Sequence, residues 1–178
     1  MATTTSAVPP LATLNTPNSA KTMDEKVSGN FLTLENPVFC CFLFWASVLV
    51  IKMLLMSLLT ALQRFRNKVF PNKEDLFFKD IEVQFDDPHV ERVRRAHRND
   101  MENILPYFTM AILYICTNPD PTVACILFRV VAIARILHTL VYAFYPVPQP
   151  SRVIAFGVAF AITIYMACAV ALDVLKHI

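Results

Sequence analysis

The sequence predicts an all-α integral membrane protein, folded as a four-helix bundle with up-down topology. Its composition is one reason: of 178 residues, 56% are hydrophobic, 17% are charged and only two are glycine, proportions that are poor for a soluble domain. The other reason is that four segments are suited to crossing a hydrocarbon core of about 30 Å, which takes roughly 20 helical residues. These spans are about residues 37–62, 98–117, 122–145 and 153–172.

The chain divides by composition into a tail and a membrane domain. Residues 1–30 are rich in Thr, Ser, Asn and Pro and contain no apolar stretch, so we expect a disordered N-terminal tail before a membrane domain over residues 31–178. Basic residues number 16 and acidic residues 14, a balance that gives no reason to expect nucleic acid as a partner. The five cysteines lie in apolar runs without metal-ligand spacing, so we expect buried thiols and no metal site.

The second span differs from the others in its charge. Span one contains a single lysine, Lys52, and span four contains no charge. The apolar part of span two, residues 104–117, rises only about 21 Å and is too short to cross the membrane alone. Because 118-NPDP-121 stops the helix at one end, the span must recruit residues before 104, which places Arg98, Asp100 and their neighbours below the headgroups. Each charge there costs roughly 2.5 to 3.5 kcal/mol, so their placement indicates a function.

The loops predict how the spans face. The segment 63–90 carries five basic residues and 118–121 carries none, so the positive-inside rule places the long loop in the cytosol and both chain ends on the lumenal side. The five are Arg64, Arg66, Lys68, Lys73 and Lys79. In this orientation the polar residues of all four spans converge in the cytosolic leaflet.

Helical periodicity arranges these polar residues in two stripes. At about 100° per residue, Asp100 points about 160° away from Glu102, so the two carboxylates need different partners. Lys52 is the unassigned base of span one, and we predict that it forms an intramembrane ion pair with Asp100. The stripe of span two contains Glu91, Arg95, Arg98, Asn99 and Glu102, and that of span three contains Arg135, His138 and Tyr142.

The stripes allow two interpretations. A membrane pocket that opens to the cytosol and is lined by arginine, histidine, tyrosine and glutamate suits an anionic ligand that forms hydrogen bonds. The arginines are equally able to anchor the helix ends by snorkelling and to pair with Glu91 and Glu102, and spacing alone leaves both interpretations open. Arg92 and Arg94, at the water boundary, fit the anchoring role best, and Arg129 lies off the stripe of span three, where a structural role is expected.

Four motifs, in order along the chain, resemble the MAPEG family of membrane-associated proteins in eicosanoid and glutathione metabolism. They are 91-ERVRRAHRNDMEN-103, 118-NPDP-121, 134-ARILHTLVY-142 and 147-VPQPSR-152, and the resemblance covers residues 37–175. It implies a four-helix subunit, a homotrimer, and glutathione as co-substrate, bound between subunits near the cytosolic face. Within the family the motifs are most similar to those of the glutathione transferases, and next to those of the prostaglandin E synthases.

The resemblance also implies roles for individual residues. Arg152 matches the family's catalytic arginine, which stabilises the glutathione thiolate. The implied glutathione contacts are Arg64, Arg94, Arg95, His97, Arg98, Asn99, Glu102, His138 and Tyr142. His97 lies off the polar arc of span two, so a structural role at the helix boundary fits it equally well. The family's prostaglandin E synthases have serine and tyrosine where this chain has Val153 and Phe156, a departure that disfavours that activity.

The function that the resemblance implies is glutathione transfer to hydrophobic electrophiles, with glutathione-dependent reduction of lipid hydroperoxides; both acceptors would enter from the membrane lipid. Glutathione carries two carboxylates and an ammonium, which arginine and Glu102 can pair, and a nearby guanidinium favours its thiolate. The alternatives are a prostaglandin E synthase or other eicosanoid synthase, and a non-catalytic lipid-binding scaffold. The expected location is the endoplasmic reticulum membrane, with the mitochondrial outer membrane as a second location.

Overall fold

The computed structural model describes residues 31–75, 83–144 and 148–178, and these residues form an all-α structure. The predicted tail, residues 1–30, and part of the predicted cytosolic loop, residues 76–82, lie outside these ranges. The elements are α2 (Pro37–Asn67), the 3₁₀ turn η1 (Lys73–Asp75), α3 (Pro88–Cys116), α4 (Pro121–Thr139), the π-helical segment η2 (Leu140–Phe144) and α5 (Ser151–Val174).

Three of the four long helices begin at the same kind of dipeptide, an Asn or Asp followed by Pro. The pairs are Asn36-Pro37, Asp87-Pro88 and Asp120-Pro121. In each pair the side-chain oxygen of the first residue accepts a 2.9 Å hydrogen bond from a backbone N–H of the first turn. The proline occupies the first helical position, where a missing N–H has no consequence. Capping chemistry in the sequence therefore fixes where these helices start.

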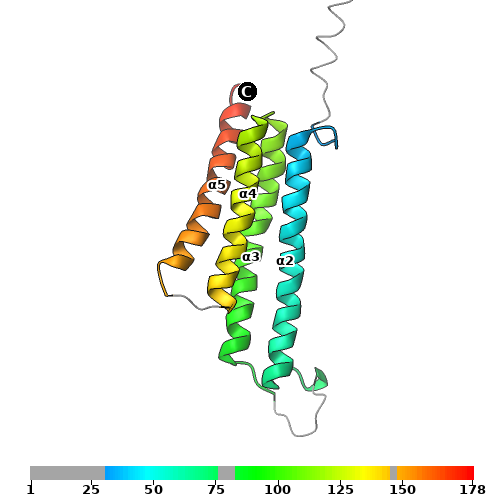
Figure 1. Cartoon of the computed structure of the whole chain (residues 1–178), viewed down its shortest axis with the longest axis vertical. Coiled ribbons are helices and arrows are strands. Elements are labelled where there is room, and N and C mark those ends of the chain that lie inside the picture. The colour runs from blue at the N-terminus through cyan, green and yellow to red at the C-terminus, as the bar shows by residue number, and fades with distance from the viewer. Residues whose placement is uncertain (1–30, 76–82, 145–147) are drawn as a thin grey trace, which may run out of the picture. The chain divides into compact units, whose positions relative to one another are not determined.

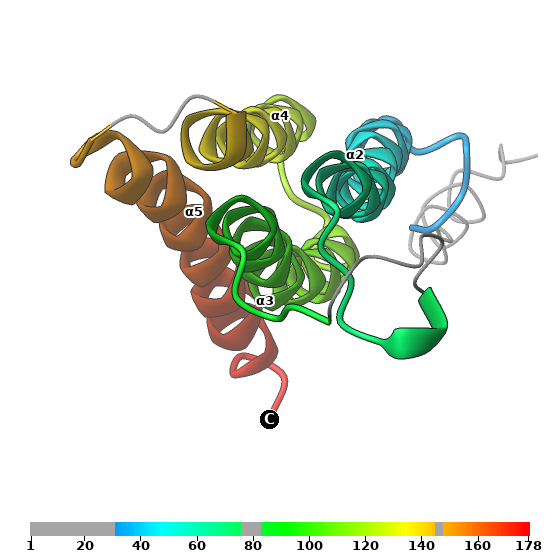
Figure 2. The same cartoon turned by 90° about the horizontal axis from the view of Figure 1, so that it is seen from below.

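The four long helices of residues 31–178 alternate in direction along the chain, and each packs against two main neighbours. Figure 1 follows the chain down α2, up α3, down α4 and up α5. Helix α3 packs mainly against α2 and α5, and α4 likewise packs against α2 and α5, while α3 and α4 touch only slightly. In the view along the bundle, α2 and α5 accordingly lie at opposite corners (Figure 2). The ends of α2 and α3 also project beyond the neighbouring ends of α4 and α5 (Figure 1).

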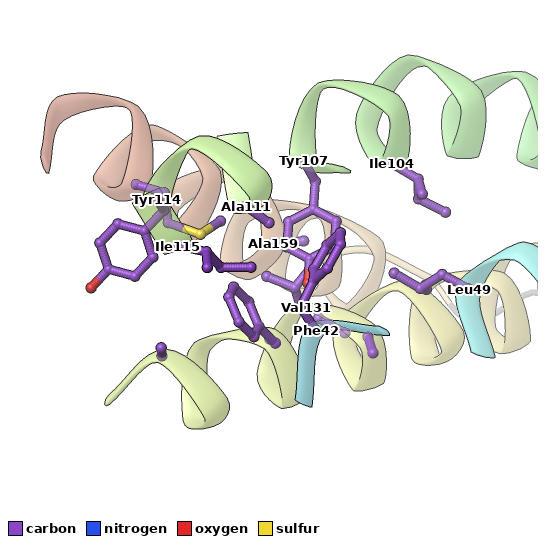
Figure 3. Close-up of a cluster of buried hydrophobic side chains, with 14 of the residues drawn as sticks. Phe42, Leu49, Ile104, Tyr107, Ala111, Tyr114, Ile115, Val131 and Ala159 are labelled. Carbon is purple, nitrogen blue, oxygen red and sulfur yellow. The ribbon is translucent and has the colours of Figure 1, made fainter. Parts of the chain in front are cut away.

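The core consists of a large apolar cluster and a smaller one. Phe42 of α2 packs edge-on against Phe128 of α4, with ring centroids 5.7 Å apart, and Figure 3 shows it among residues of the other helices. The smaller cluster is formed by Met56, Val93 and Ala96, with the partly buried side chains of Leu59, Tyr142 and Ala143 packed against it. The second cluster holds the η2 segment against α2 and α3.

In the part of the chain that the structure describes, three helices are long and apolar enough to cross a membrane: Pro37–Asn67, Pro121–Phe144 and Ser151–Val174. Helix α3 does not meet that criterion, because its N-terminal half is charged, and its crossing of the membrane stays a prediction. In α5 only Ala159 and Met166 are buried, so most of its apolar surface faces outward. Such a surface needs lipid or another protein against it.

Several helix limits differ from the predicted spans. Helix α2 continues five residues past 62, to Asn67, and α3 begins at Pro88, ten residues before 98. Helical structure thus extends beyond the apolar stretches, because caps rather than hydropathy end these helices. The expectation of buried thiols is wrong for Cys116 and Cys168, which are exposed because they lie on outward faces, and the other three cysteines are only half-buried.

Candidate functional site

Helix α3 carries opposite kinds of residue on its two faces. Val93, Ala96 and Asp100 face the core and are buried, whereas Arg95 and Glu102 are exposed. This is the division that the stripe of span two predicts. Two ion pairs lie along the outward face: Glu91 with Arg94, and Arg98 with Glu102 at 3.9 Å. The pair of Arg98 and Glu102 is exposed and Glu91 is half-buried, and pairs near the surface contribute little to stability.

A groove of about 400 Å³ lies between α2 and α3 and contains four of the predicted residues. Its lining consists of Ser57, Thr60, Glu91, Arg94, Arg95, His97, Arg98 and Met101. Three guanidinium groups against one carboxylate make it a basic groove, suited to carboxylates and to hydrogen bonding. We call it the arginine groove. His97 faces it and is half-buried.

A second group of predicted residues meets where η2 and α5 adjoin. The rings of His138 and Tyr142 have centroids 5.6 Å apart, and the guanidinium carbon of Arg152 lies 4.9 Å from the centroid of the Tyr142 ring. A cation at this distance from an aromatic ring is attracted to its face. We call these three residues the stacked cluster. Within the described residues, Nε of Arg152 and Nδ1 of His138 are buried without a hydrogen-bond partner.

The π-helical turn explains how Tyr142 reaches this position. Sequence periodicity treats residues 122–145 as one regular helix, but the backbone changes to π-helical over Leu140–Phe144. A π turn adds a residue to the helical turn and redirects the side chains that follow, and it recurs at functional sites. Here it seats Tyr142 between His138 on α4 and Arg152 on α5.

The predicted pair of Lys52 and Asp100 is confirmed. The structure adds a partner that the sequence interpretation missed, because Nη2 of Arg135 lies 2.6 Å from Oδ1 of Asp100. The same nitrogen donates to Oδ1 of Asn99 at 2.8 Å. The hydroxyl of Thr139 lies 3.4 Å from Oδ2 of Asp100 and 3.3 Å from the carbonyl oxygen of Arg135, and its single hydrogen can be donated to either. Two cations and one carboxylate, which we call the buried triad, therefore join α2, α3 and α4.

Arg64 and Glu102 lie outside both the arginine groove and the stacked cluster. Arg64 is half-buried in the last turn of α2 and belongs to neither the groove nor the stacked cluster. Glu102 lines a separate cavity of about 100 Å³ between α3 and α5, beside Asn103 and Phe160. One chain therefore does not bring the predicted glutathione contacts into one pocket. In the described part of the chain, no group of His, Cys, Asp and Glu is arranged to hold a metal ion.

Comparison with known proteins adds an independent line of information. The MAPEG family profile matches residues 42–172, which include every predicted site residue. Microsomal glutathione S-transferase 1 of Homo sapiens is 42% identical over 139 residues, which cover 75% of this chain and 89% of the relative. The protein of that name from Rattus norvegicus is 43% identical over the same coverage. Prostaglandin E synthase of Equus caballus is 37% identical over 138 residues, covering 77% of this chain and 90% of the relative.

Proposed function

This chain belongs to the MAPEG family, and from that premise we propose that it transfers the thiolate of glutathione to hydrophobic electrophiles dissolved in the membrane. It is a multi-pass membrane protein, and relatives with similar sequences over most of its length are enzymes, a transferase and a synthase. The transferase proposal follows the stronger match: 42% identity over 139 residues, against 37% over 138 or 41% over 113 residues for the synthases.

The observation that carries the proposal is the position of Arg152 in the stacked cluster. Arg152 is the second residue of α5, so its guanidinium lies at a helix N-terminus, where the macrodipole also favours negative charge. The ring of Tyr142 lies under the guanidinium and limits the directions in which it can point. A thiol with a pKa near 8.5 is mostly protonated at neutral pH, and lowering that pKa by about two units takes about 2.7 kcal/mol. A fixed guanidinium is suited to supply this stabilisation.

The arginine groove suits the rest of the glutathione molecule. Two carboxylates match its guanidinium groups, and the ammonium matches Glu91 or Glu102. Because one chain spreads these residues around α3, we propose a homotrimer in which glutathione lies between subunits and Arg64 reaches the glutathione of a neighbour. The exposed apolar faces of α2 and α5 and the exposed charges of α3 are consistent with such packing.

The reaction balances without any other reactant. In transfer, the thiolate sulfur attacks the electrophilic carbon, a carbon–sulfur bond forms, and the leaving group departs with the electron pair of the broken bond. In peroxide reduction, two glutathione molecules give one disulfide, while the hydroperoxide is reduced to an alcohol and water. Arg152 stabilises the attacking thiolate in both reactions. We place the site at the cytosolic face of the endoplasmic reticulum membrane.

Prostaglandin E synthesis is the second candidate, because relatives of that name are 37% to 41% identical to this chain. Two residues of α5 disfavour it. Val153 and Phe156 carry no hydroxyl, and Phe156 is instead stacked on Phe160 with ring centroids 5.4 Å apart. A hydroxyl-dependent step at those positions has no donor in this chain. A lipid-binding scaffold without turnover would need no thiolate stabiliser such as Arg152.

The test is turnover by detergent-purified protein with glutathione and, in parallel, chlorodinitrobenzene, a lipid hydroperoxide and a prostaglandin endoperoxide. The first two should be consumed; turnover of the endoperoxide alone would instead establish a synthase, and glutathione binding without turnover a scaffold. Arg152→Leu should lower kcat, leave glutathione affinity within a few fold, and raise the apparent pKa of the bound thiol. Arg129→Leu, an exposed arginine in the opposite leaflet, is the matched control. An unshifted thiolate titration with normal turnover in Arg152→Leu would remove Arg152 from the mechanism.

A further inference from the structure

We propose that Arg135 is a positioning residue that orients the side-chain amide of Asn99 as a hydrogen-bond donor to a carboxylate of glutathione. The inference rests on the proposed function, because it assigns Arg135 and Asn99 to the same glutathione site. It also gives the buried triad a role besides stability.

The geometry centres on one nitrogen atom of Arg135. Its Nη2 donates to Oδ1 of Asn99 at 2.8 Å and to Oδ1 of Asp100 at 2.6 Å. This nitrogen carries two N–H bonds, so one hydrogen is available for each acceptor. The two acceptors belong to consecutive residues of α3. A single guanidinium on α4 therefore fixes the side chains of Asn99 and Asp100 relative to each other.

The guanidinium itself has little freedom to move. Arg135 and Asp100 are 1% and 0% exposed, so separating them would leave uncompensated charges in the protein interior. The second oxygen of Asp100 pairs with Lys52 and lies 3.4 Å from the hydroxyl of Thr139, whose single hydrogen is also within reach of the carbonyl oxygen of Arg135 at 3.3 Å. Arg135 and Asp100 form a charge-balanced pair by themselves, so Asp100 holds Arg135 even where Lys52 is replaced.

The amide of Asn99 is oriented as a result. Its carbonyl oxygen accepts from Arg135, so its N–H₂ group must point away from the guanidinium. Turning the amide over would exchange a charge-assisted hydrogen bond for two donors facing a cation, which makes that orientation rare.

Asn99 lies next to proposed glutathione contacts on the surface of α3. Asn99 is half-buried, and around the axis of α3 it falls between exposed Arg95, about 40° away, and buried Asp100, about 100° away. The N–H₂ group is therefore at the edge of the exposed basic face. A carboxylate bound by the arginines can accept from it, whereas the ammonium of glutathione cannot.

The test measures discrimination between glutathione and analogues that lack one carboxylate. The two probes are the ethyl ester of the glycine carboxyl and the analogue with γ-aminobutyrate in place of γ-glutamate. Comparing wild type with Asn99→Ala identifies which carboxylate the amide contacts. Asn99→Ala should lower the preference for glutathione over one of the two probes by about tenfold, the effect of one charge-assisted hydrogen bond.

Arg135→Met should then lower the same preference to the level of Asn99→Ala, by raising KM for glutathione with kcat within twofold. The double variant should lose nothing further, because both changes remove one interaction. Arg135→Lys keeps the charge beside Asp100, but its side chain is one bond shorter and cannot reach Asn99 and Asp100 together, so it should behave like Arg135→Met; it serves where that variant does not assemble. Lys52→Met is the matched control, since it removes the other cation and leaves Asn99 and Arg135 in place.

Each failure has a distinct meaning. A wild-type protein that neither binds nor turns over glutathione contradicts the proposed function. Normal wild-type discrimination that persists in Arg135→Met or Arg135→Lys overturns the positioning role alone. Equal loss of discrimination in Lys52→Met also overturns it, because the effect would then come from general loosening of the buried triad.

Discussion

Replacing Asp100 by asparagine should destabilise the protein far more than replacing either of its cationic partners. Asp100 is fully buried, and it is the only carboxylate that the described residues provide to both Lys52 and Arg135. Asparagine has nearly the same size, so the substitution removes charge without creating a cavity. It leaves buried Arg135 and Lys52, whose side chain is 12% exposed, near each other with no anion between them.

The magnitude follows from the burial of the three groups. Breaking a buried ion pair by removing one partner costs about 3 to 5 kcal/mol. For a domain of this size each kcal/mol lowers Tm by roughly 2 to 4 °C, so Asp100→Asn should lower Tm on the order of 10 °C. Lys52→Met leaves Arg135 and Asp100 as a balanced pair and removes the excess charge. Its effect should stay within about 1 kcal/mol.

The assay is thermal unfolding in detergent, followed through the fluorescence of the single tryptophan, Trp45, which packs against the main core. The control is Asp173→Asn, which removes an exposed carboxylate 3.0 Å from Lys176 and should change stability by less than about 0.5 kcal/mol. Equal effects of Asp100→Asn and Lys52→Met, or no effect of Asp100→Asn, would show that charge balance in the triad does not govern stability.

Three further predictions concern assembly, the stacked cluster and a helix cap. Co-assembly of Arg64→Ala chains with Arg152→Ala chains should restore part of the activity that each variant lacks alone, because a shared site can then be built from one intact residue of each chain; strictly no rescue in purified mixed trimers would argue against sharing. Tyr142→Leu should lower kcat several-fold by releasing the guanidinium, whereas Tyr142→Phe keeps the ring and should retain most of it, as measured with chlorodinitrobenzene. Hydrogen bonds, chiefly from the backbone N–H of Val90, hold the pKa of Asp87 below its usual range, so the stabilisation by its carboxylate is present above about pH 4 and is lost as pH falls through the lowered pKa. Asp87→Ala should therefore lower the free energy of unfolding by about 1 kcal/mol at neutral pH and by progressively less below pH 4. A difference that does not change with pH would contradict the cap.

The parts of the fold that could be predicted from the sequence are those set by local chemistry. The starts of α2 and α4 lie within one residue of the predicted spans, whereas α3 starts ten residues earlier, at an Asp-Pro cap that the span prediction did not use. The pair of Lys52 and Asp100 follows from two unmatched charges at similar depth. The sequence placed Arg135 on one helix face with His138 and Tyr142, but it did not identify Asp100 as the residue that Arg135 pairs with. Periodicity says which way a side chain points, and only packing between helices says what it meets.

The grouping of the site residues could not be predicted for the same reason. One arc of α3 contains the residues of the arginine groove and also Glu102, but α2 borders one side of that arc and α5 the other, so the residues fall into different cavities. The π turn at Leu140–Phe144 was missed as well, because a regular helix and a π-helical one are compatible with the same apolar sequence.

The two faces of α3 show why the site and the assembly belong together. On the inward face, Asp100 is compensated within the chain by Lys52 and Arg135. On the outward face, Arg98 and Glu102 lie 3.9 Å apart and are exposed. Water makes such exposure inexpensive, but at membrane depth each charge costs several times more than an exposed pair gains. In the proposed homotrimer, neighbouring subunits would exclude lipid from this face and bound glutathione would supply the negative charge that the groove lacks, so the two together would remove that cost. Glutathione binding should therefore stabilise the assembled protein against heat, and it should do so less in Glu102→Gln, which lacks a partner for the ammonium.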